Sequence, residues 1–300
     1  MPGRDFRRPK GRRGPWGKPG PPASGGGGGP GSAGGANVTA GASRPLTGRR
    51  VVITRSREQG PELARRLEAL GATVYSVPTI RFAPPDDTDP LDRAIADLDR
   101  FDWVVFTSPN GVRFFWERLA ALGFGPEKLA GPRVAAIGPG TAAELTRRGR
   151  PPDVVPAEAL TARIPEALGD VRGRRVLLPR TDIAGPELAE SLRSFGAEVV
   201  SVVAYRTLPD TTGQTQLIRL LRGRQVDAIT LTSASTARGL AAMAGPVWQL
   251  LDGVKVICIG PVTARAAAEA GLKVDVVAGE HTLDGLVRAV VDAFRAVPKA

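Results

Sequence analysis

Short apolar runs alternate with amphipathic segments along residues 48–296. Val51–Thr54 is a short apolar run, which is typical of a strand buried on both faces of a parallel sheet. Residues 60–71 open with Gly-Pro, repeat leucine at helical spacing and end at glycine, which predicts an amphipathic helix. The alternation continues with strands over Thr73–Val77, Asp102–Thr107, Arg133–Ile137, Asp153–Val155, Val199–Ala204 and Val256–Ile259, and with helices near Val112–Leu122 and Thr141–Arg148.

The pattern occurs twice in the chain. Gly48-Arg-Arg-Val is repeated 125 positions later from Gly173, and Gly60-Pro-Glu-Leu-Ala is repeated from Gly185 at the same offset. Farther along, Ile-Gly-Pro at 137–139 is matched at 259–261, an offset of 122. A register kept over some hundred residues indicates a duplicated unit.

Strand–helix alternation predicts parallel sheets with right-handed crossovers. The expected fold class is therefore α/β, with two flavodoxin-like doubly wound parallel-sheet domains. Taken alone, the periodicity predicts two halves in tandem.

Composition separates the first 47 residues from the rest. The formal net charge is +11, and residues 1–47 contribute eight basic side chains against Asp5. The same segment holds 14 Gly and 8 Pro, so it cannot bury enough surface to offset its ordering entropy and is predicted to be disordered. It is either a weak tether for nucleic acid or a partner, or a solvated extension. We favour the extension because no aromatic ladder accompanies the basic residues.

Several classes of protein are excluded by the residues that the sequence lacks. No apolar run approaches the ~18 residues that a membrane-spanning helix needs, and the basic N-terminus is not followed by the apolar stretch of a secretory signal. One cysteine, Cys258, and one histidine, His281, rule out an internal disulfide, a zinc ribbon and a Cys/His metal cage. A soluble, cytoplasmic, metal-free protein is the expectation.

The candidate chemistry lies in loops that follow the predicted strands, where ligands bind in such sheets. Small and hydroxyl residues at these places leave backbone N–H groups open at helix N-termini, which suits carboxylates or phosphates. Arg55 and Arg180, at equivalent strand ends, could add contacts to an anion. The alternative is helix capping alone, because Ser and Thr are common N-caps. The loop candidates for anion binding are Thr107, Ser108, Asn110, Gly138, Thr141, Ser233, Ser235 and Gly260.

The remaining chemistry-bearing residues have two interpretations each. No complete dinucleotide or nucleoside-triphosphate phosphate motif is present, which disfavours that chemistry. Cys258 lies in an apolar strand and is expected to pack, with a nucleophile as the alternative. His281 is expected at the start of the last helix, with a Ser–His pair as the alternative, which no GxSxG motif supports. Tyr205 follows the strand Val199–Ala204, where a phenol could act as a general acid, although an interface aromatic is the alternative.

These residues together resemble uroporphyrinogen-III synthase. The resemblance covers residues 48 to about 296 and none of the tail. Its segments are Phe106–Val112, Leu178–Arg180, Val203–Thr207, Thr232-Ser233 and Ile259–Ala264. It implies interleaved domains, in which 48–80 and 206–300 form one domain and 81–205 the other.

The resemblance also implies a function, a hydro-lyase of porphyrin and heme biosynthesis. The substrate would be hydroxymethylbilane, a linear tetrapyrrole with eight carboxylates, and the product uroporphyrinogen III, formed with loss of water and inversion of the last pyrrole ring. No cofactor or metal is implied. Tyr205 falls on the family's candidate general acid, and Thr263, Ser108 and Ser233 fall on positions that line the cleft. We expect a monomer without membrane or nucleic-acid partners, and the preceding deaminase is the candidate for a transient contact.

Two other functions remain open at this point. A non-catalytic two-domain protein that closes on an anionic small molecule would bind tightly without turnover. A nucleic-acid-associated protein acting through its tail would show salt-sensitive binding that disappears when residues 1–47 are deleted.

Overall fold

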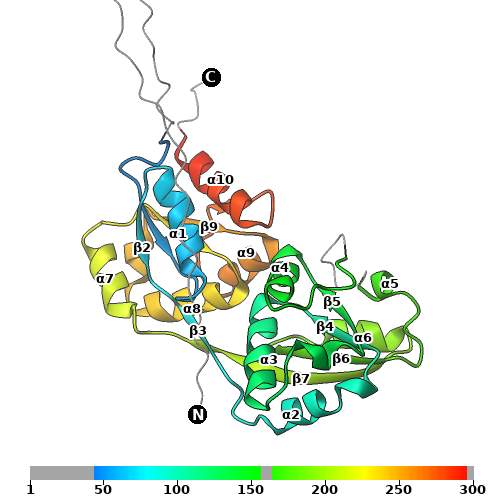
Figure 1. The fold of residues 1–300 in the computed structure, drawn as a ribbon. Helices are drawn as coiled ribbons and strands as arrows, with labels where there is room; N and C mark the ends of the chain where they lie inside the picture. The colour runs from blue at the N-terminus through cyan, green and yellow to red at the C-terminus, as the bar shows by residue number, and fades with distance from the viewer. Residues whose placement is uncertain (1–43, 157–163, 296–300) are drawn as a thin grey trace, which may run out of the picture. The chain divides into compact units, whose positions relative to one another are not determined.

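Two five-stranded sheets form the framework of the chain. The computed structural model describes residues 44–156 and 164–295. The first sheet has the order β10-β9-β8-β1-β2 and the second the order β3-β7-β6-β4-β5 (Figure 1). The strands are β1 (Arg50–Ile53), β2 (Thr73–Ser76), β3 (Ile80–Ala83), β4 (Trp103–Phe106), β5 (Arg133–Ala136), β6 (Arg175–Thr181), β7 (Glu198–Pro209), β8 (Ala228–Leu231), β9 (Lys255–Cys258) and β10 (Val276–Val277).

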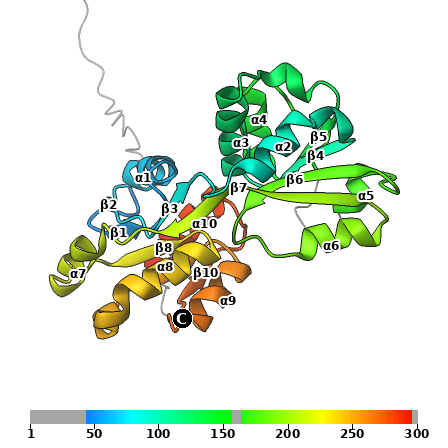
Figure 2. The ribbon, with the colours of Figure 1, turned by 90° about the horizontal axis from the view of Figure 1, so that it is seen from below.

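Helices cover both faces of each sheet. The described helices are α1 (Gly60–Ala69), α2 (Asp89–Ala96), α3 (Pro109–Ala121), α4 (Pro139–Arg147), α5 (Ile164–Leu168), α6 (Glu187–Ser194), α7 (Gln214–Arg222), α8 (Ala234–Ala244), α9 (Pro261–Glu269) and α10 (Leu283–Phe294), with 3₁₀ turns η1 (Leu98–Arg100), η2 (Pro126–Leu129) and η4 (Gly245–Leu251). On the second sheet, α2, α3 and α4 pack on one face and α5 and α6 on the other (Figure 2). On the first sheet, α7, α8 and α9 oppose α1 and α10.

The sheet orders confirm the duplication and show that each sheet contains strands from both copies of the repeat. Offsets of 125 and 122 place β1 on β6, β2 on β7, β4 on β8 and β5 on β9. In each sheet these equivalent strands take the same relative order, but β1 pairs with β8 of the second copy and β4 pairs with β6 of the second copy. The tandem halves predicted from periodicity are therefore wrong, because pairing occurs between copies. The interleaved α/β fold is confirmed.

The structure corrects three sequence expectations about strands. β3 pairs antiparallel with β7, so the second sheet is not wholly parallel. The strand predicted over Asp153–Val155 is a single bridge between Val154 and Ala135, in the place that β10 takes in the first sheet. The strand predicted to end at Ala204 continues to Pro209, because β3 supplies backbone partners for its last residues. Tyr205 therefore lies inside β7.

A fourth correction concerns the end of the predicted tail. Residues 1–43 lie outside the described part of the chain, so the disorder predicted for them does too. Leu46, inside the predicted tail, is fully buried among the core residues under α1 and α10, and its N–H donates to the Leu70 carbonyl at 2.9 Å. The folded part therefore includes residues before 48. The domain boundaries at 80 and 206 stay a prediction.

Asp102 and Asp227 are aligned by the offset of 125 and have the same structural role. The Asp227 carboxylate accepts the backbone N–H of Arg50 at 2.7 Å and its Nε–H at 3.0 Å. Asp102, 125 positions earlier, accepts the N–H of Arg175 at 2.8 Å and the side chain of Arg174 at 2.9 Å. Each carboxylate thereby satisfies the first N–H of a neighbouring strand, and this need accounts for the match in sequence.

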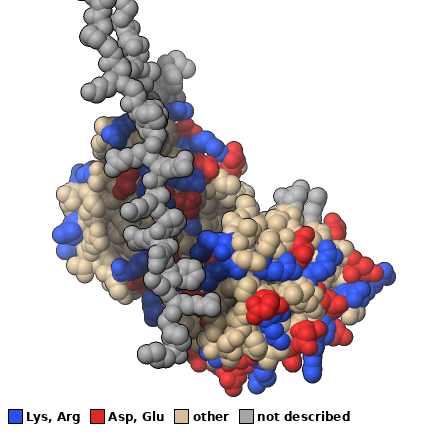
Figure 3. Space-filling view, viewed as in Figure 1, with Lys and Arg blue, Asp and Glu red and all other residues tan. Residues whose placement is uncertain are grey.

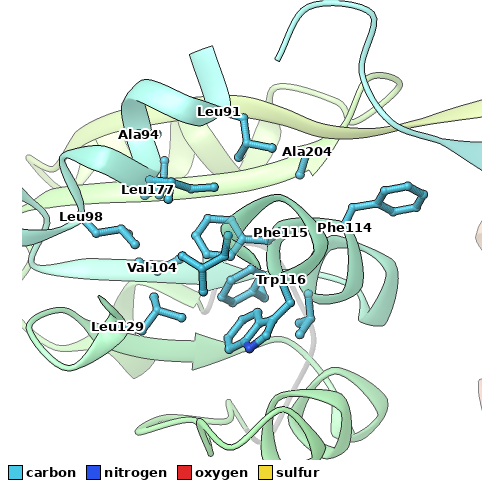
Figure 4. Packing of buried hydrophobic residues seen from close by; sticks show 14 of the residues in the cluster. Leu91, Ala94, Leu98, Val104, Phe114, Phe115, Trp116, Leu129, Leu177 and Ala204 are labelled. Carbon is cyan, nitrogen blue, oxygen red and sulfur yellow. The ribbon is translucent and has the colours of Figure 1, made fainter. Parts of the chain in front are cut away.

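The aromatic core of the second sheet fixes helix α3. Phe115 and Trp116 point from α3 into the apolar cluster around Val104 and Leu177 (Figure 4). Phe106, on β4, packs edge-on against Phe115 at a ring-centroid distance of 5.3 Å. These contacts hold the N-terminus of α3 at the carboxyl end of β4.

Candidate active site

A cavity of about 1040 Å³ lies where strands of both sheets end. From the first sheet it is reached by Arg55 after β1, Ser233 after β8 and Ile259 after β9. From the second sheet it is reached by Asn110 after β4 and Pro139 after β5. The carboxyl ends of parallel strands are the usual place for a ligand in doubly wound folds. This cavity is the candidate site.

Five of the twelve predicted site residues line this cavity: Arg55, Asn110, Tyr205, Ser233 and Ser235. Seven do not: Thr107, Ser108, Gly138, Thr141, Arg180, Gly260 and Thr263. Among these, Thr141, Arg180 and Thr263 are buried. The Arg180 guanidinium donates to the Gly185 carbonyl, so it holds the loop that follows β6.

Tyr205 is a buried phenol among the residues that line the cavity. The residue is 5% exposed, and its ring stacks on Phe114 at 5.5 Å and meets Phe82 edge-on at 5.6 Å. Its hydroxyl lies 3.1 Å from Ser108 Oγ. Burial raises the pKa of the Tyr205 phenol above its ordinary value, although its hydrogen bond with Ser108 acts to lower it. The phenol is therefore protonated at neutral pH and has a proton to donate.

A β-bulge decides which way Tyr205 points. Arg180 pairs with Val203 and Thr181 pairs with Tyr205, so Ala204 is an extra residue in β7. Side chains alternate along a regular strand, yet Ala204 and Tyr205 are both buried in the same apolar cluster. The bulge therefore turns Tyr205 to the face of Val202 and Ala204. Strand periodicity would place it on the opposite face.

The matched loops divide into two kinds. Ser108 and Ser233 are N-caps of α3 and α8, and their Oγ atoms accept the N–H groups of residues three positions later. For these two serines the capping alternative is confirmed, and Ser233 lines the cavity as well. Gly138 and Gly260, the N-caps of α4 and α9, provide no side-chain acceptor. The first N–H groups of α4, beside the cavity-lining Gly140, are therefore not capped by a side chain.

Arg55 is the cavity-lining arginine that forms no ion pair within the described residues, although the charge of Glu62 acts on it. Its Nη2 donates to Gln59 Oε1 at 3.2 Å, and its Nε is buried without a hydrogen-bond partner in the described chain. Burial lowers the pKa of the Arg55 guanidinium, which nevertheless remains charged. A half-buried cation with an unused N–H is suited to take a ligand carboxylate.

Acidic side chains also line the cavity, and sequence reasoning did not select them. Arg66 pairs with Glu62 at 2.7 Å and with Asp284, and Arg147 pairs with Glu144. These two arginines are therefore partly neutralised by neighbours. Across the face shown in Figure 3, acidic and basic side chains are likewise interspersed. The remaining lining residues that the sequence analysis did not select as site candidates are Glu58, Gln59, Ile80, Phe82, Pro109, Pro139, Gly140, Ala143, Thr181, Ile183, Thr207, Thr232, Thr236, Ile259, Thr282 and Leu283.

The one histidine and the one cysteine of the sequence lie in different environments. His281 lines the cavity next to Thr282, the N-cap of α10. Its ring lies close to Gly260, because a Cβ atom added at that glycine would come within 2.9 Å of the ring. Cys258 is fully buried in β9, and burial raises the pKa of its thiol to about 11. Its thiol is consequently unreactive at neutral pH, which agrees with a packing role.

Within the described residues no helix is long and apolar enough to cross a membrane. Comparisons with known proteins agree with the fold. The family model described as uroporphyrinogen-III synthase HemD matches residues 61–288. The uroporphyrinogen-III synthase of Synechococcus elongatus is 34% identical over 261 residues, which cover 83% of this chain and 97% of that protein.

A second curated relative and one solved structure support the same assignment, and another solved structure shares the fold. The uroporphyrinogen-III synthase of Chlorobaculum parvum is 29% identical, covering 82% of this chain and 99% of that protein. A crystal structure of a mutant uroporphyrinogen III synthase from Thermus thermophilus matches with a TM-score of 0.58 and 26% identity, covering 82% of this chain and 99% of that one. The Helicobacter pylori enzyme shares the fold, with a TM-score of 0.56 at 18% identity, covering 82% and 99%. This chain belongs to the uroporphyrinogen-III synthase family.

Proposed function

We propose that this chain cyclises hydroxymethylbilane to uroporphyrinogen III in the cavity at the strand ends, with Tyr205 as the proton donor. Membership of the family supports the overall reaction, a water-eliminating cyclisation in porphyrin biosynthesis. The single observation that carries the assignment of the site is the protonated Tyr205 phenol that lines this cavity.

The phenol would act on the leaving hydroxyl. Tyr205 gives its proton to the substrate hydroxyl, the C–O bond breaks with its electron pair remaining on oxygen, and water leaves. The protonated azafulvene that remains, paired with the Tyr205 phenolate, is attacked by the substituted carbon of the last ring, which gives a spiro intermediate. That intermediate fragments and closes in the inverted sense. Loss of a ring proton restores the pyrrole, and this proton returns to the Tyr205 phenolate.

Binding would follow from the few unpaired donors of the cavity. Arg55 offers a charged N–H, and Asn110, Ser235 and the uncapped start of α4 offer neutral donors. The neighbouring Glu58 and Glu62 repel substrate carboxylates, so they restrict the orientations in which an octacarboxylate fits. Orientation is the larger part of catalysis here, because the azafulvene closes unaided to the uninverted isomer.

Several finer assignments belong to the same proposal. Thr263 is buried in the first turn of α9 outside the lining residues, and its catalytic role stays a prediction. We propose that the chain passes between domains before β3 and after β7, near the predicted boundaries at 80 and 206. A cytoplasmic monomer that takes substrate directly from the preceding deaminase fits a substrate that cyclises spontaneously.

The proposed function is tested with freshly generated hydroxymethylbilane. After oxidation of the products, the type I and type III isomers are separated and quantified. We expect mainly type III with the protein and type I without it. Formation of type I alone at the uncatalysed rate would refute the proposal, and tight binding of the bilane without turnover would favour the binding-protein alternative.

A further inference from the structure

Asp182 contacts β7 immediately after the bulge that orients Tyr205. Its backbone N–H donates to the Tyr205 carbonyl at 3.1 Å. Its Oδ1 accepts the backbone N–H of Thr207 at 2.9 Å and the hydroxyl of Thr181 at 2.9 Å. One residue therefore binds the backbone immediately at Tyr205 and two positions beyond it.

The Asp182 carboxylate lies at the end of the β6–β7 pairing, where β6 offers no further backbone acceptor to β7. The pairing of β6 with β7 ends at Thr181 opposite Tyr205, so the next N–H of β7 on that edge, from Thr207, has no backbone partner in β6. An unsatisfied strand N–H beside a bulge would let the ladder fray. Oδ1 of Asp182 satisfies this donor and closes the end of the pairing.

Asp182 is not among the residues that line the cavity, so it has no direct access to a bound substrate there. Its two neighbours Thr181 and Thr207 do line it, and their hydroxyl oxygens lie 2.9 Å apart. The effect of Asp182 on the site must therefore pass through the backbone and hydroxyls that it holds.

We propose that Asp182 is a positioning residue for the reaction: by binding the Thr207 N–H and the Thr181 hydroxyl, it fixes the bulge that turns the Tyr205 phenol into the cavity. This inference rests on the proposed role of Tyr205 as proton donor. The alternative is that Asp182 only stabilises the end of the β6–β7 pairing.

The charges around the phenol come from three elements. Besides burial, the charge of Asp182, in the loop after β6, raises the pKa of Tyr205, and Arg113, on α3, lowers it. Arg206, on β7, lies 4.0 Å from the Asp182 carboxylate and also pairs with Asp86. Removing the Asp182 charge should lower the phenol pKa, and releasing the bulge should lower it further by admitting water.

The experiment compares Asp182→Asn with Asp182→Ala. Asn keeps an oxygen that can accept from Thr207, so kcat should stay within about threefold of the parent, whereas Ala should lower kcat at least ~10-fold with little change in KM. The matched control is Asp170→Ala. Asp170 likewise accepts a backbone N–H, from Arg172 at 3.2 Å, and pairs with the Arg172 side chain, but it lies before β6, at the opposite end of that strand.

A readout independent of turnover follows the phenol itself. Tyr75 is the other tyrosine of the chain, so in a Tyr75→Phe background the tyrosinate absorbance reports Tyr205 alone. Asp182→Asn removes the charge alone, whereas Asp182→Ala also releases the bulge. The titration should therefore move down towards the ordinary value near pH 10 further in Asp182→Ala than in Asp182→Asn, and Asp170→Ala should leave it in place. Equal titrations in Asp182→Ala and Asp182→Asn would overturn the positioning role even if Tyr205 proved not to be the acid.

The double variant decides whether Asp182 acts through Tyr205. Asp182→Ala should cost no further activity once Tyr205→Phe is present. Losses that multiply would overturn the proposal, and so would an Asn variant as slow as Ala. If Asp182→Ala does not fold, the Asn variant alone decides, because it must retain turnover. Wild-type turnover in Tyr205→Phe, together with a titration that shifts further in Asp182→Ala than in Asp182→Asn, would instead refute the acid role while supporting the positioning.

Discussion

Replacing Tyr205 with Phe should separate chemistry from packing. Phe retains the ring that stacks on Phe114 and meets Phe82, so the aromatic contacts of the site survive. The substitution removes one hydroxyl and its hydrogen bond with Ser108. Ser108 Oγ keeps its partner, the N–H of Gly111 at 2.9 Å, so no buried polar atom is orphaned. The free energy of unfolding should fall by about 1 kcal/mol, the net value of one hydrogen bond.

The expected kinetic effect is much larger than that. Loss of a positioned acid lowers kcat by about 10–10⁴-fold, towards the low end where water can replace the phenol. A loss of about 1 kcal/mol lowers Tm by only about 2–4 °C in a domain of this size. The assay measures kcat and KM with fresh hydroxymethylbilane and Tm by circular dichroism on the same preparation. Turnover at the wild-type rate would refute the acid role, and slow turnover with a Tm lowered by about 10 °C or more, well beyond the shift of one hydrogen bond, would indicate a structural role.

The remaining predictions concern binding, the folded boundary and acid stability. Arg55→Gln should raise KM about 10–150-fold, which is the equivalent of a charge-assisted hydrogen bond of about 1.5–3 kcal/mol. The matched control, Arg57→Gln, changes a neighbouring exposed arginine and should leave KM within about twofold of the parent. Equal KM values for both variants would contradict the assignment of Arg55. Deleting residues 1–43 should leave Tm and turnover nearly unchanged. Deleting residues 1–47 also removes the buried Leu46 and should lower the free energy of unfolding in urea by about 2–5 kcal/mol. Equal effects of the two deletions would show that Leu46 does not contribute to the core. Hydrogen bonding from Arg50 holds the pKa of Asp227 below its usual range, so its stabilisation is present above the unfolded pKa of about 3.9 and is lost as pH falls through the folded value. Asp227→Asn should therefore show a smaller fall in Tm below about pH 4 than the parent, and parallel Tm–pH curves would contradict this.

The local elements and the kind of site follow from the order of residues along the chain. Apolar runs and leucine spacing located most strands and helices to within a few residues, because burial of a strand or of a helix face requires a regular pattern. The internal repeat identified equivalent loops, and parallel sheets gather such loops at one edge. Arg55, Asn110 and Ser233 could therefore be selected from the pattern of residues alone.

Strand pairing and the meeting of distant side chains depend on the three-dimensional fold. Neither copy of the repeat shows that β1 pairs with β8, because pairing depends on contacts about 175 residues apart that leave no local pattern. The acidic lining residues and Phe82 come to the cavity from helices and a strand outside the matched loops. The orientation of Tyr205 depends on one extra residue in β7, since a bulge reverses the face that alternation predicts. A phenol at this position could be read from the sequence, but its direction depends on the register between β6 and β7 and on the contacts that hold it.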